Sequence, residues 1–290
     1  NGCECEPLLH TDQHHMLHHA NEIVRAFSEL MQATGAKRGV IALKKKYKEA
    51  TKILTDAIGN RPIELALLPN FYPAGDEQTL VREVTGRSVP PLGLPLMVGA
   101  VVANVGTLVS VAHALDGKPV THKFLTVTGE VKKPGIVCVP IGTPLSACLE
   151  AAGGPTVSDP VFVLGGPMMG LIATNLEAPN IKGTAGILFF TDKEDRSVEN
   201  PTCIHCGKCL TVCPMKLEPL YMYKYFQNRD FENMQKYHIL DCFECGSCSY
   251  NCPGRLPLTH TFKTAKLLFA ARAAEEKARA EAAAKEAETK

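Results

Sequence analysis

Eight of the 12 cysteines in this 290-residue chain fall into two copies of one spacing. Each copy reads C-x2-C-x2-C-x3-C-P, over residues 203–214 and again over 242–253. Three closely spaced thiolates of this pattern hold one face of a [4Fe–4S] cubane, and the fourth cysteine reaches a neighbouring cluster. The spacing therefore predicts two [4Fe–4S] clusters that exchange ligands, and two clusters in one small domain carry electrons rather than catalyse.

The predicted ligand sets combine both copies. The first cluster takes three cysteines of the first copy and the last cysteine of the second, namely Cys203, Cys206, Cys209 and Cys252. The second cluster takes Cys242, Cys245, Cys248 and Cys213. Gly207 and Gly246 occupy equivalent places, where backbone N–H groups can approach the sulfur atoms. Zinc is the alternative, but zinc sites use two C-x2-C pairs across a longer spacer and need no third cysteine.

Composition narrows the class of protein further. A formal net charge of +1 argues against a general nucleic-acid binder, and 45 % hydrophobic residues suffice for packed cores. No export signal precedes the cysteines, so we expect a reducing compartment, where clustered cysteines bind metals.

The chain opens on Asn1 rather than Met, and we expect it to be part of a longer protein. Cys138 and Cys148 lie in apolar contexts and are expected to be buried.

Hydrophobic periodicity predicts an α/β arrangement in the first half of the chain. Helices are expected at Asp12–Ala33 and Lys44–Ala57, and strands at Arg38–Leu43 and Ile63–Leu68. The apolar stretch Leu92–Ala112 is long enough to span a bilayer, but proline, glycine and asparagine interrupt it. We interpret it as buried strand and turn structure.

The second half predicts a small α+β module and then a helical region. Strands are expected at 123–128, 136–139 and 161–164, with a helix at 144–152. Residues 192–200 are a predicted linker. The aromatic run 217–240 is expected to pack around the clusters rather than to stack on bases. Residues 271–290 favour a helix that has no apolar face.

Two other motifs have a functional and a purely structural interpretation. Five histidines cluster at the start of the first predicted helix: His10, His14, His15, His18 and His19. Their spacing suits a metal, but we favour an exposed polar helix face. Gly165–Gly170 contains two methionines that suit a soft metal ion, and we favour a conformational turn.

Several segments together resemble the RnfC subunit of the Rnf ion-translocating electron-transport complex. They are NGCECEP at 1–7, YPAGDE at 72–77, NVGTL at 104–108, GGPMMG at 165–170 and the paired cysteine motifs. The first half is also similar to the cobalamin reductase PduS and, more distantly, to the NADH-oxidising flavoprotein subunit of complex I. The PduS type has a looser second cysteine motif and a further domain, so the regular motif and the charged tail favour the RnfC type.

The resemblance implies an α/β plus α+β fold class with three parts and a tail. These are a partial complex I flavoprotein-like FMN/NADH-binding domain at 1–117 and a β-grasp (SLBB) module at 118–192. A mainly helical two-[4Fe–4S] ferredoxin-type domain follows at 193–265, and an Ala/Glu/Lys-rich helical tail at 266–290.

The resemblance also implies cofactor-binding residues for FMN and NADH. The acidic loop contributes Asn1, Glu4 and Glu6, a second loop contributes Tyr72, Gly75, Asp76 and Glu77, and Asn104 with Thr107 lies beside FMN. Cys3 stands where the complex I relative has an acid, and Ala103 stands where it has a second asparagine. The Gly-rich phosphate-binding segment that precedes the acidic loop in this family is not in this sequence, so we expect half of a flavin pocket.

The implied function is electron transfer from NADH through FMN and the two clusters to a redox partner, with no catalytic acid, base or nucleophile. The implied partners are other subunits of a membrane complex and ferredoxin or a similar carrier, with no nucleic acid. The implied location is the cytoplasmic face of the membrane, held peripherally through those partners. Alternatives are a PduS-like cobalamin reductase of a microcompartment and a non-enzymatic iron–sulfur relay or docking module.

Overall fold

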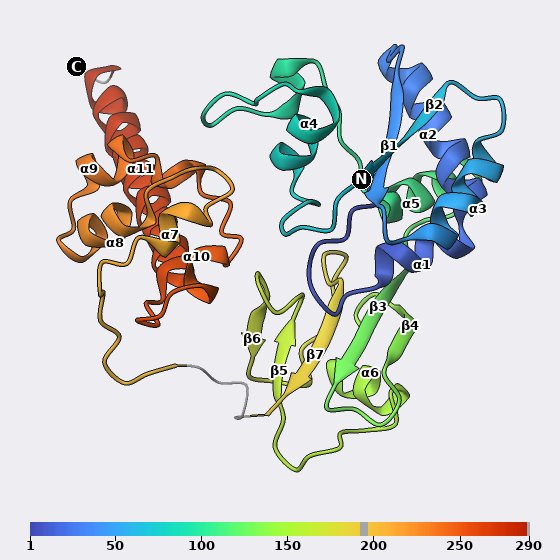
Figure 1. Cartoon of the computed structure of the whole chain (residues 1–290). Helices are drawn as coiled ribbons and strands as arrows, with labels where there is room; N and C mark the ends of the chain where they lie inside the picture. Colours follow the sequence, from blue (N-terminus) through green and yellow to red (C-terminus); the bar gives the residue numbers. More distant parts are fainter. Residues whose placement is uncertain (192–196, 289–290) are drawn as a thin grey trace. The chain divides into compact units, whose positions relative to one another are not determined.

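The chain forms two compact units, 1–195 and 196–290, and each is described here by itself (Figure 1). The computed structural model describes residues 1–191 and 197–288. Residues 192–196 of the predicted linker therefore lie outside the described residues. No helix among the described residues is long and apolar enough to cross a membrane.

The first part of unit 1 is a two-stranded parallel sheet with helices packed around it. Strand β1 (Gly39–Lys44) pairs with β2 (Ile63–Leu68) in parallel, with Gly39 opposite Ile63. The helices are α1 (Thr11–His18), α2 (Ala20–Thr34), α3 (Lys48–Ile58), α4 (Glu77–Thr85) and α5 (Val105–Leu115), with a 3₁₀ turn η1 (Pro95–Val98). Fully buried residues of the core include Met16, Ile23, Leu43, Leu54 and Val105. The predicted α/β pattern is confirmed.

Two predicted elements of this part are wrong in their bounds. The helix expected over 12–33 is broken at His19, whose φ of −128° is not helical, so α1 and α2 are separate. The second helix begins at Lys48 rather than Lys44, because Lys44 still belongs to β1 and pairs with Leu68. Neither difference changes which side chains reach the core.

The expectation of buried strand and turn structure for 92–112 is wrong. The first half is an exposed loop with η1, in which Leu92 is 65 % and Val101 74 % exposed. The second half is α5, which buries Val105, Leu108 and Ala112 against the core. Their spacing of three and four residues is helical, and Pro95 and Gly99 prevent the preceding part from joining the helix.

The β-grasp part of unit 1 is a five-stranded mixed sheet in the order β4-β3-β7-β5-β6. The strands are β3 (His122–Gly129), β4 (Gly135–Pro140), β5 (Val161–Leu164), β6 (Leu171–Ala173) and β7 (Gly186–Phe190). Strand β3 is parallel to β7 and antiparallel to β4, and helix α6 (Leu145–Ala151) closes the core over Leu125 and Phe189. The predicted α+β module is confirmed.

Two expectations for individual side chains need correction. The histidines do not form a wholly exposed face, because His15 is buried and the ring of Phe124 in β3 lies within 5.6 Å of the rings of His14, His15 and His19. Cys148 is buried as expected, but Cys138 is exposed. Cys138 lies in β4 at the edge of the sheet, where its side of the strand faces solvent.

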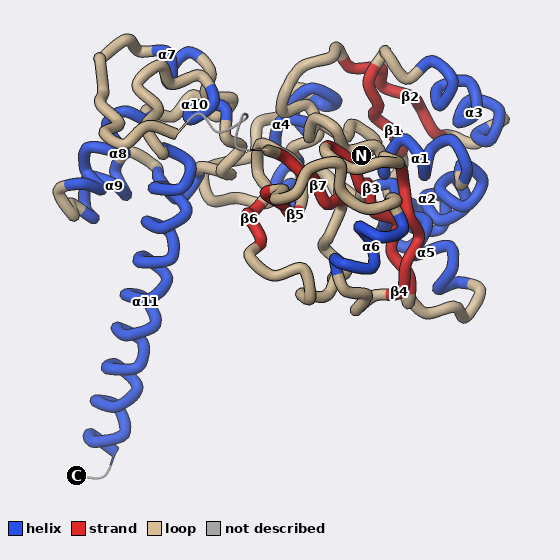
Figure 2. The backbone as a smooth tube through the Cα atoms, turned by 90° about the horizontal axis from the view of Figure 1, so that it is seen from below, coloured by secondary structure: helices blue, strands red, loops and turns tan. Residues whose placement is uncertain are grey.

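Unit 2 is a helical bundle around one long helix, α11 (Leu258–Glu288) (Figure 2). The shorter elements are α7 (Lys208–Thr211), α8 (Pro219–Gln227), α9 (Phe231–Lys236), η3 (Ile239–Asp241) and α10 (Ser247–Tyr250). Phe262 and Ala265 bury the first part of α11, whereas residues 271–282 are exposed. The helix runs through the predicted boundary between 265 and 266, and its exposed part agrees with a tail that has no apolar face.

Candidate functional site

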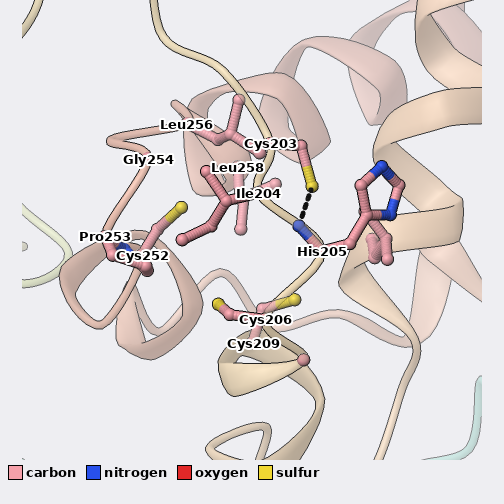
Figure 3. A pocket seen from close by; sticks show the side chains of 12 residues that line it. Cys203, Ile204, His205, Cys206, Cys209, Cys252, Pro253, Gly254, Leu256 and Leu258 are labelled. Carbon is pink, nitrogen blue, oxygen red and sulfur yellow. Dashed lines mark hydrogen bonds between the residues drawn. The ribbon is translucent and has the colours of Figure 1, made fainter.

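The eight motif cysteines lie in two separate hollows of unit 2. The first hollow, of about 370 Å³ including space open to solvent, is lined by Cys203, Cys206, Cys209 and Cys252 (Figure 3). The second, of about 310 Å³, is lined by Cys213, Cys242, Cys245 and Cys248. Each hollow thus gathers the four cysteines that the spacing predicts for one cluster, including the one exchanged between the motifs. That these sulfur atoms bind iron stays a prediction.

Left-handed backbone shapes both cysteine loops. His205 (φ 55°) and Glu244 (φ 63°) occupy equivalent positions, as do Gly207 (φ 73°) and Gly246 (φ 80°). This geometry turns backbone N–H groups toward sulfur, and the N–H of His205 lies 3.4 Å from Cys203 Sγ. The two loops therefore have the same built-in donors.

A close contact between the two motifs brings Cys252 to the first hollow. Gly254 follows Cys252 and Pro253, and a Cβ at Gly254 would lie only 2.0 Å from the carbonyl oxygen of Thr202. Thr202 directly precedes Cys203. Only glycine permits this approach, so the segment after the second motif lies against the start of the first.

The side chains of both hollows fit iron–sulfur clusters. The ligand atoms are all thiol sulfurs, and polar groups lie beside them: the Leu217 N–H donates to Cys213 Sγ at 3.3 Å, and the Cys245 thiol donates to the Ser247 hydroxyl at 3.4 Å. Burial raises the pKa of Cys242 to about 11 and that of Cys248 to about 12. These thiols are neutral at pH 7 by themselves, and iron would supply the charge that favours their thiolate form.

The two hollows differ in their exposure. At the first, Ile204, His205 and Cys206 are exposed, whereas at the second Cys245 and Cys248 are buried. Helix α8 lies between them and directs Leu220 to the first hollow and Met222 to the second. The aromatic rings of this region pack against the core of unit 2, which contains Cys248 and Cys252, and Tyr225 and Tyr237 are centred 5.0 Å apart. That they surround bound clusters stays a prediction.

Three segments predicted to bind flavin come together in unit 1. The side-chain amide of Asn1 donates to the carbonyl of Gly75 at 2.9 Å, which joins the acidic loop to the second loop. A Cβ at Gly75 would lie 2.2 Å from the carbonyl oxygen of Cys3, so this contact requires glycine. The backbone of Asn1 pairs with Ala103 and Val105, which joins the acidic loop to the start of α5.

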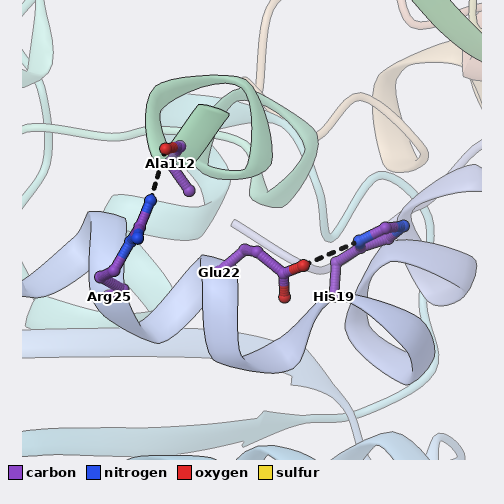
Figure 4. Close-up of polar contacts among 4 residues, drawn as sticks. All are labelled: His19, Glu22, Arg25 and Ala112. Atoms are coloured by element: carbon purple, nitrogen blue, oxygen red, sulfur yellow. Dashed lines mark hydrogen bonds and ion pairs between the residues drawn. The ribbon is translucent and has the colours of Figure 1, made fainter. Parts of the chain in front are cut away.

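Asn104 connects α5 to a carboxylate that the sequence did not single out. Its Oδ1 accepts the Gly106 N–H at 2.7 Å and caps α5, while its Nδ2 donates to Asp12 Oδ2 at 2.9 Å. At the other end of α5, the Arg25 guanidinium of α2 donates to the Ala112 carbonyl (Figure 4). The same guanidinium pairs with Asp116 at 2.8 Å. Both ends of the helix that carries Asn104 are therefore fixed.

Three ionisable groups lie behind this site, of which Lys44 is buried and Glu4 and Asp12 are half-buried. Burial and, to a lesser extent, the neighbouring Asp12 raise the pKa of Glu4 to about 8. Burial also raises the pKa of Asp12 itself and lowers that of Lys44, a lysine only 5 % exposed at the end of β1. Sequence reasoning missed Asp12 and Lys44. The only available signal for Lys44 was a lysine ending a strand that otherwise consists of Gly, Val, Ile, Ala and Leu.

The remaining predicted residues have other roles or stand open to solvent. The Glu6 carboxylate lies on the Gly165–Gly170 turn, where it accepts the Met168 N–H at 3.1 Å. Asp76 caps α4 by accepting the Thr79 N–H at 2.9 Å. Glu77 and Thr107 are exposed, and Tyr72 is half-buried.

The predicted set fits the polar edge of a flavin ring. Apart from Gly75, it consists of amide, hydroxyl and carboxyl groups that donate and accept hydrogen bonds. None of its nine residues carries a positive charge for a phosphate: Asn1, Glu4, Glu6, Tyr72, Gly75, Asp76, Glu77, Asn104 and Thr107.

Comparison with known families confirms the three predicted domain types. Residues 1–113 match the family described as the Nuo51 FMN-binding domain, residues 124–172 match the SLBB domain, and residues 196–253 match the 4Fe-4S dicluster domain. Cofactor types that the sequence predicts, FMN and paired [4Fe–4S] clusters, are those of the matched domains. The predicted boundaries at 117, 192 and 265 stay predictions.

Individual relatives fall into two groups. The chain is 44 % identical over 230 residues to the cobalamin reductase PduS of Salmonella typhimurium, covering 75 % of this chain and 51 % of that protein. It is 38 % identical over 245 residues to a subunit of the Na⁺-translocating ferredoxin:NAD⁺ oxidoreductase complex of Acetobacterium woodii, covering 83 % and 55 %. The chain thus spans about half the length of these relatives.

A solved structure shares the fold. An NAD⁺-reducing [NiFe]-hydrogenase in the H₂-reduced state superposes with a TM-score of 0.56 at 20 % identity, covering 91 % of this chain and 53 % of that one. At this identity the likeness shows the architecture alone.

Proposed function

Because the chain is a homologue of both the RnfC-type subunits of ion-translocating oxidoreductase complexes and the PduS cobalamin reductases, we propose that it is an electron-transfer subunit. It passes electrons between NADH and FMN on one side and a redox partner on the other. The observation that carries this proposal is the pair of hollows, each lined by four cysteines in the exchanged grouping. When bound, FMN accepts a hydride and the clusters carry single electrons.

In this proposal the protein positions the cofactors and sets their surroundings. The eight cysteines hold the clusters, and the apolar side chains of Leu220, Met222 and Phe262 cover part of the hollows. The acidic loop and the start of α5 present polar groups to one edge of the flavin. The half-buried Glu4, whose pKa is raised to about 8, favours its neutral form at pH 7 and so puts no negative charge beside a flavin that gains electrons.

The proposed partners are the other subunits of an ion-translocating membrane complex and ferredoxin or a similar electron carrier. The relatives' names support this, since several of them are subunits of such complexes. We place the chain peripherally on the cytoplasmic face of the cell membrane through those partners. The exposed first hollow, with Ile204 63 % exposed, suits electron exchange with a second protein.

Reduction of cobalamin is the second candidate function. The 44 % identity to PduS favours it, whereas the regular spacing of the second cysteine motif favours the first candidate. A relay without flavin is the third candidate, because the predicted flavin set lacks a group for the phosphate.

Anaerobic reconstitution with iron and sulfide tests the proposal. We expect about eight iron and eight sulfide per chain, brown absorption and FMN-dependent reduction of the clusters by NADH once the upstream segment of a relative is supplied. Bound zinc in place of iron would refute electron transfer altogether. Clusters without flavin binding would favour the relay, and reduction of cobalamin by the flavin-loaded protein would favour the second candidate.

A further inference from the structure

The two cysteine loops carry different charges at the same position. The residue before the second cysteine is His205 in the first loop and Glu244 in the second, and both have left-handed backbone. His205 is exposed. Glu244 lines the second hollow and pairs with Lys266 of α11, with 3.1 Å between Glu244 Oε1 and Lys266 Nζ. The two loops therefore have the same backbone conformation at this position, but the second hollow has an ion pair beside it.

Lys266 is held at the second hollow by two contacts. Its ammonium group pairs with Glu244 and also donates to the backbone carbonyl of Cys242, one of the predicted ligands. Phe262, one turn earlier on α11, lines the same hollow, so this face of the helix is directed toward the second cysteine loop. The side chains of Lys266 and Glu244 are 28 % and 21 % exposed, which shields their charges in part from solvent screening.

We propose that Lys266 and Glu244 act as an opposed charge pair that sets the reduction potential of the second cluster. This rests on the proposed function, in which Cys213, Cys242, Cys245 and Cys248 hold that cluster. A [4Fe–4S] cluster takes up one electron, so reduction adds one negative charge to the hollow. A nearby cation favours the reduced form and a nearby carboxylate opposes it. Removing either member leaves the other uncompensated, so the two removals shift the potential in opposite directions.

A redox titration followed by electron paramagnetic resonance tests this on the full chain. Iron and acid-labile sulfide are measured first, and dithionite then serves as the reductant. We expect Lys266→Gln to lower one of two midpoint potentials and Glu244→Gln to raise the same one. The double variant should return it close to the wild-type value. Lys266→Arg, which keeps the charge, should shift it least.

The chain offers a matched control on the same helix. Lys277 also pairs with a glutamate, Glu281 at 3.9 Å, but it is 79 % exposed and lies 11 residues beyond Lys266, about 16 Å along the helix. Lys277→Gln should move neither midpoint. The first cluster is an internal control, because its midpoint should stay fixed in every variant.

The outcomes separate this inference from the proposed function. A wild-type chain that binds no iron and sulfide refutes the proposed function. A chain that binds both clusters but shows equal midpoints in wild type, Lys266→Gln and Glu244→Gln refutes the charge pair alone. Shifts of the same sign in the two variants also refute it, since a merely structural disturbance has no reason to change sign with the charge.

Discussion

The carboxylate oxygen Oε2 of Glu6 accepts the backbone N–H of Met168 at 3.1 Å, and this bond joins the acidic loop to the turn between β5 and β6. The segment that follows Glu6 is bound to the same β-grasp sheet. The N–H of His10 donates to Thr126 Oγ1 at 3.1 Å, and the hydroxyl of Thr11 donates to the Ala185 carbonyl at 3.0 Å. The β-grasp part therefore supports the acidic loop directly.

The first prediction concerns Gly166, which leaves room for the Glu6 carboxylate. A Cβ there would lie 2.0 Å from Glu6 Oε2, so Gly166→Ala should displace the acidic loop and cost about 1–3 kcal/mol. Thermal unfolding measures the loss. Glu6→Ala should recover part of it in the double variant, because the clash with the carboxylate is removed while that with the Cβ of residue 6, at 2.5 Å, remains. Gly135→Ala is the control, with nothing within 4 Å of its added Cβ, and an equal effect there would contradict the explanation.

The second prediction is a pH dependence that comes from Glu4. Its pKa is raised to about 8, mainly by burial, so the folded protein binds a proton on Glu4 that the unfolded chain releases near pH 4.5. The contribution of Glu4 to the free energy of unfolding is therefore fully present below pH 4.5. It is lost as the pH rises toward 8, with a slope of at most about 1.4 kcal/mol per pH unit.

Glu4→Gln should flatten this slope and raise the melting temperature of unit 1 above pH 8. Calorimetric scans at a series of pH values between 5 and 9 provide the measurement. Glu83→Gln, which alters an exposed carboxylate on α4, should leave the wild-type slope in place. An unchanged slope in Glu4→Gln would show that Glu4 is ionised in the folded protein.

The third prediction separates the two parts of α11. Phe262 is fully buried and lines the second hollow, so Phe262→Ala should cost about 3–5 kcal/mol of stability. Removing residues 275–290 should change stability by less than about 0.5 kcal/mol, because that part of the helix is exposed where its side chains are described. The cut spares Arg272, which lies 4.3 Å from the centre of the Phe231 ring. A large loss on truncation would contradict the exposed state of this part of the helix.

Short sequence patterns were enough to predict two of the strands and the grouping of the cysteines. Strands β2 and β5 lie at the predicted 63–68 and 161–164, because short apolar runs between turn residues decide them. The spacing within each motif also predicts the exchanged grouping of cysteines. The first three cysteines of a motif hold one cluster, and the fourth reaches the cluster of the other motif. The strands and the spacing within each cysteine motif are patterns of about 12 residues or fewer.

Tertiary contacts decided what the sequence did not reveal. His19 breaks a helix that periodicity predicts as continuous, and it contacts Phe124, which lies more than 100 residues away. Burial on folding is the largest cause of the altered pKa values of Lys44 and Asp12. No pattern within 92–101 distinguishes an exposed apolar loop from a buried strand. The attachment of Glu6 to Met168 likewise spans 162 residues.

The last prediction tests the exchange of ligands between the two cysteine motifs. Cys252 belongs to the second motif by sequence but lines the first hollow, and Cys213 does the reverse. Cys252→Ala should therefore lose the first cluster and keep the second, leaving about half of the iron. Cys213→Ala should lose the second cluster and keep the first.

The charge pair identifies which cluster remains. In a Cys252→Ala background the surviving midpoint potential should still respond to Lys266→Gln, whereas in Cys213→Ala it should not. Cys138→Ala is the control, because this exposed cysteine of the β-grasp sheet lies far from both motifs in sequence and should retain all the iron. If Cys252→Ala instead abolished the response to Lys266, each motif would hold its own cluster and the exchanged grouping would be wrong. The hollows argue for exchange, since each contains one cysteine from the other motif beside its own three.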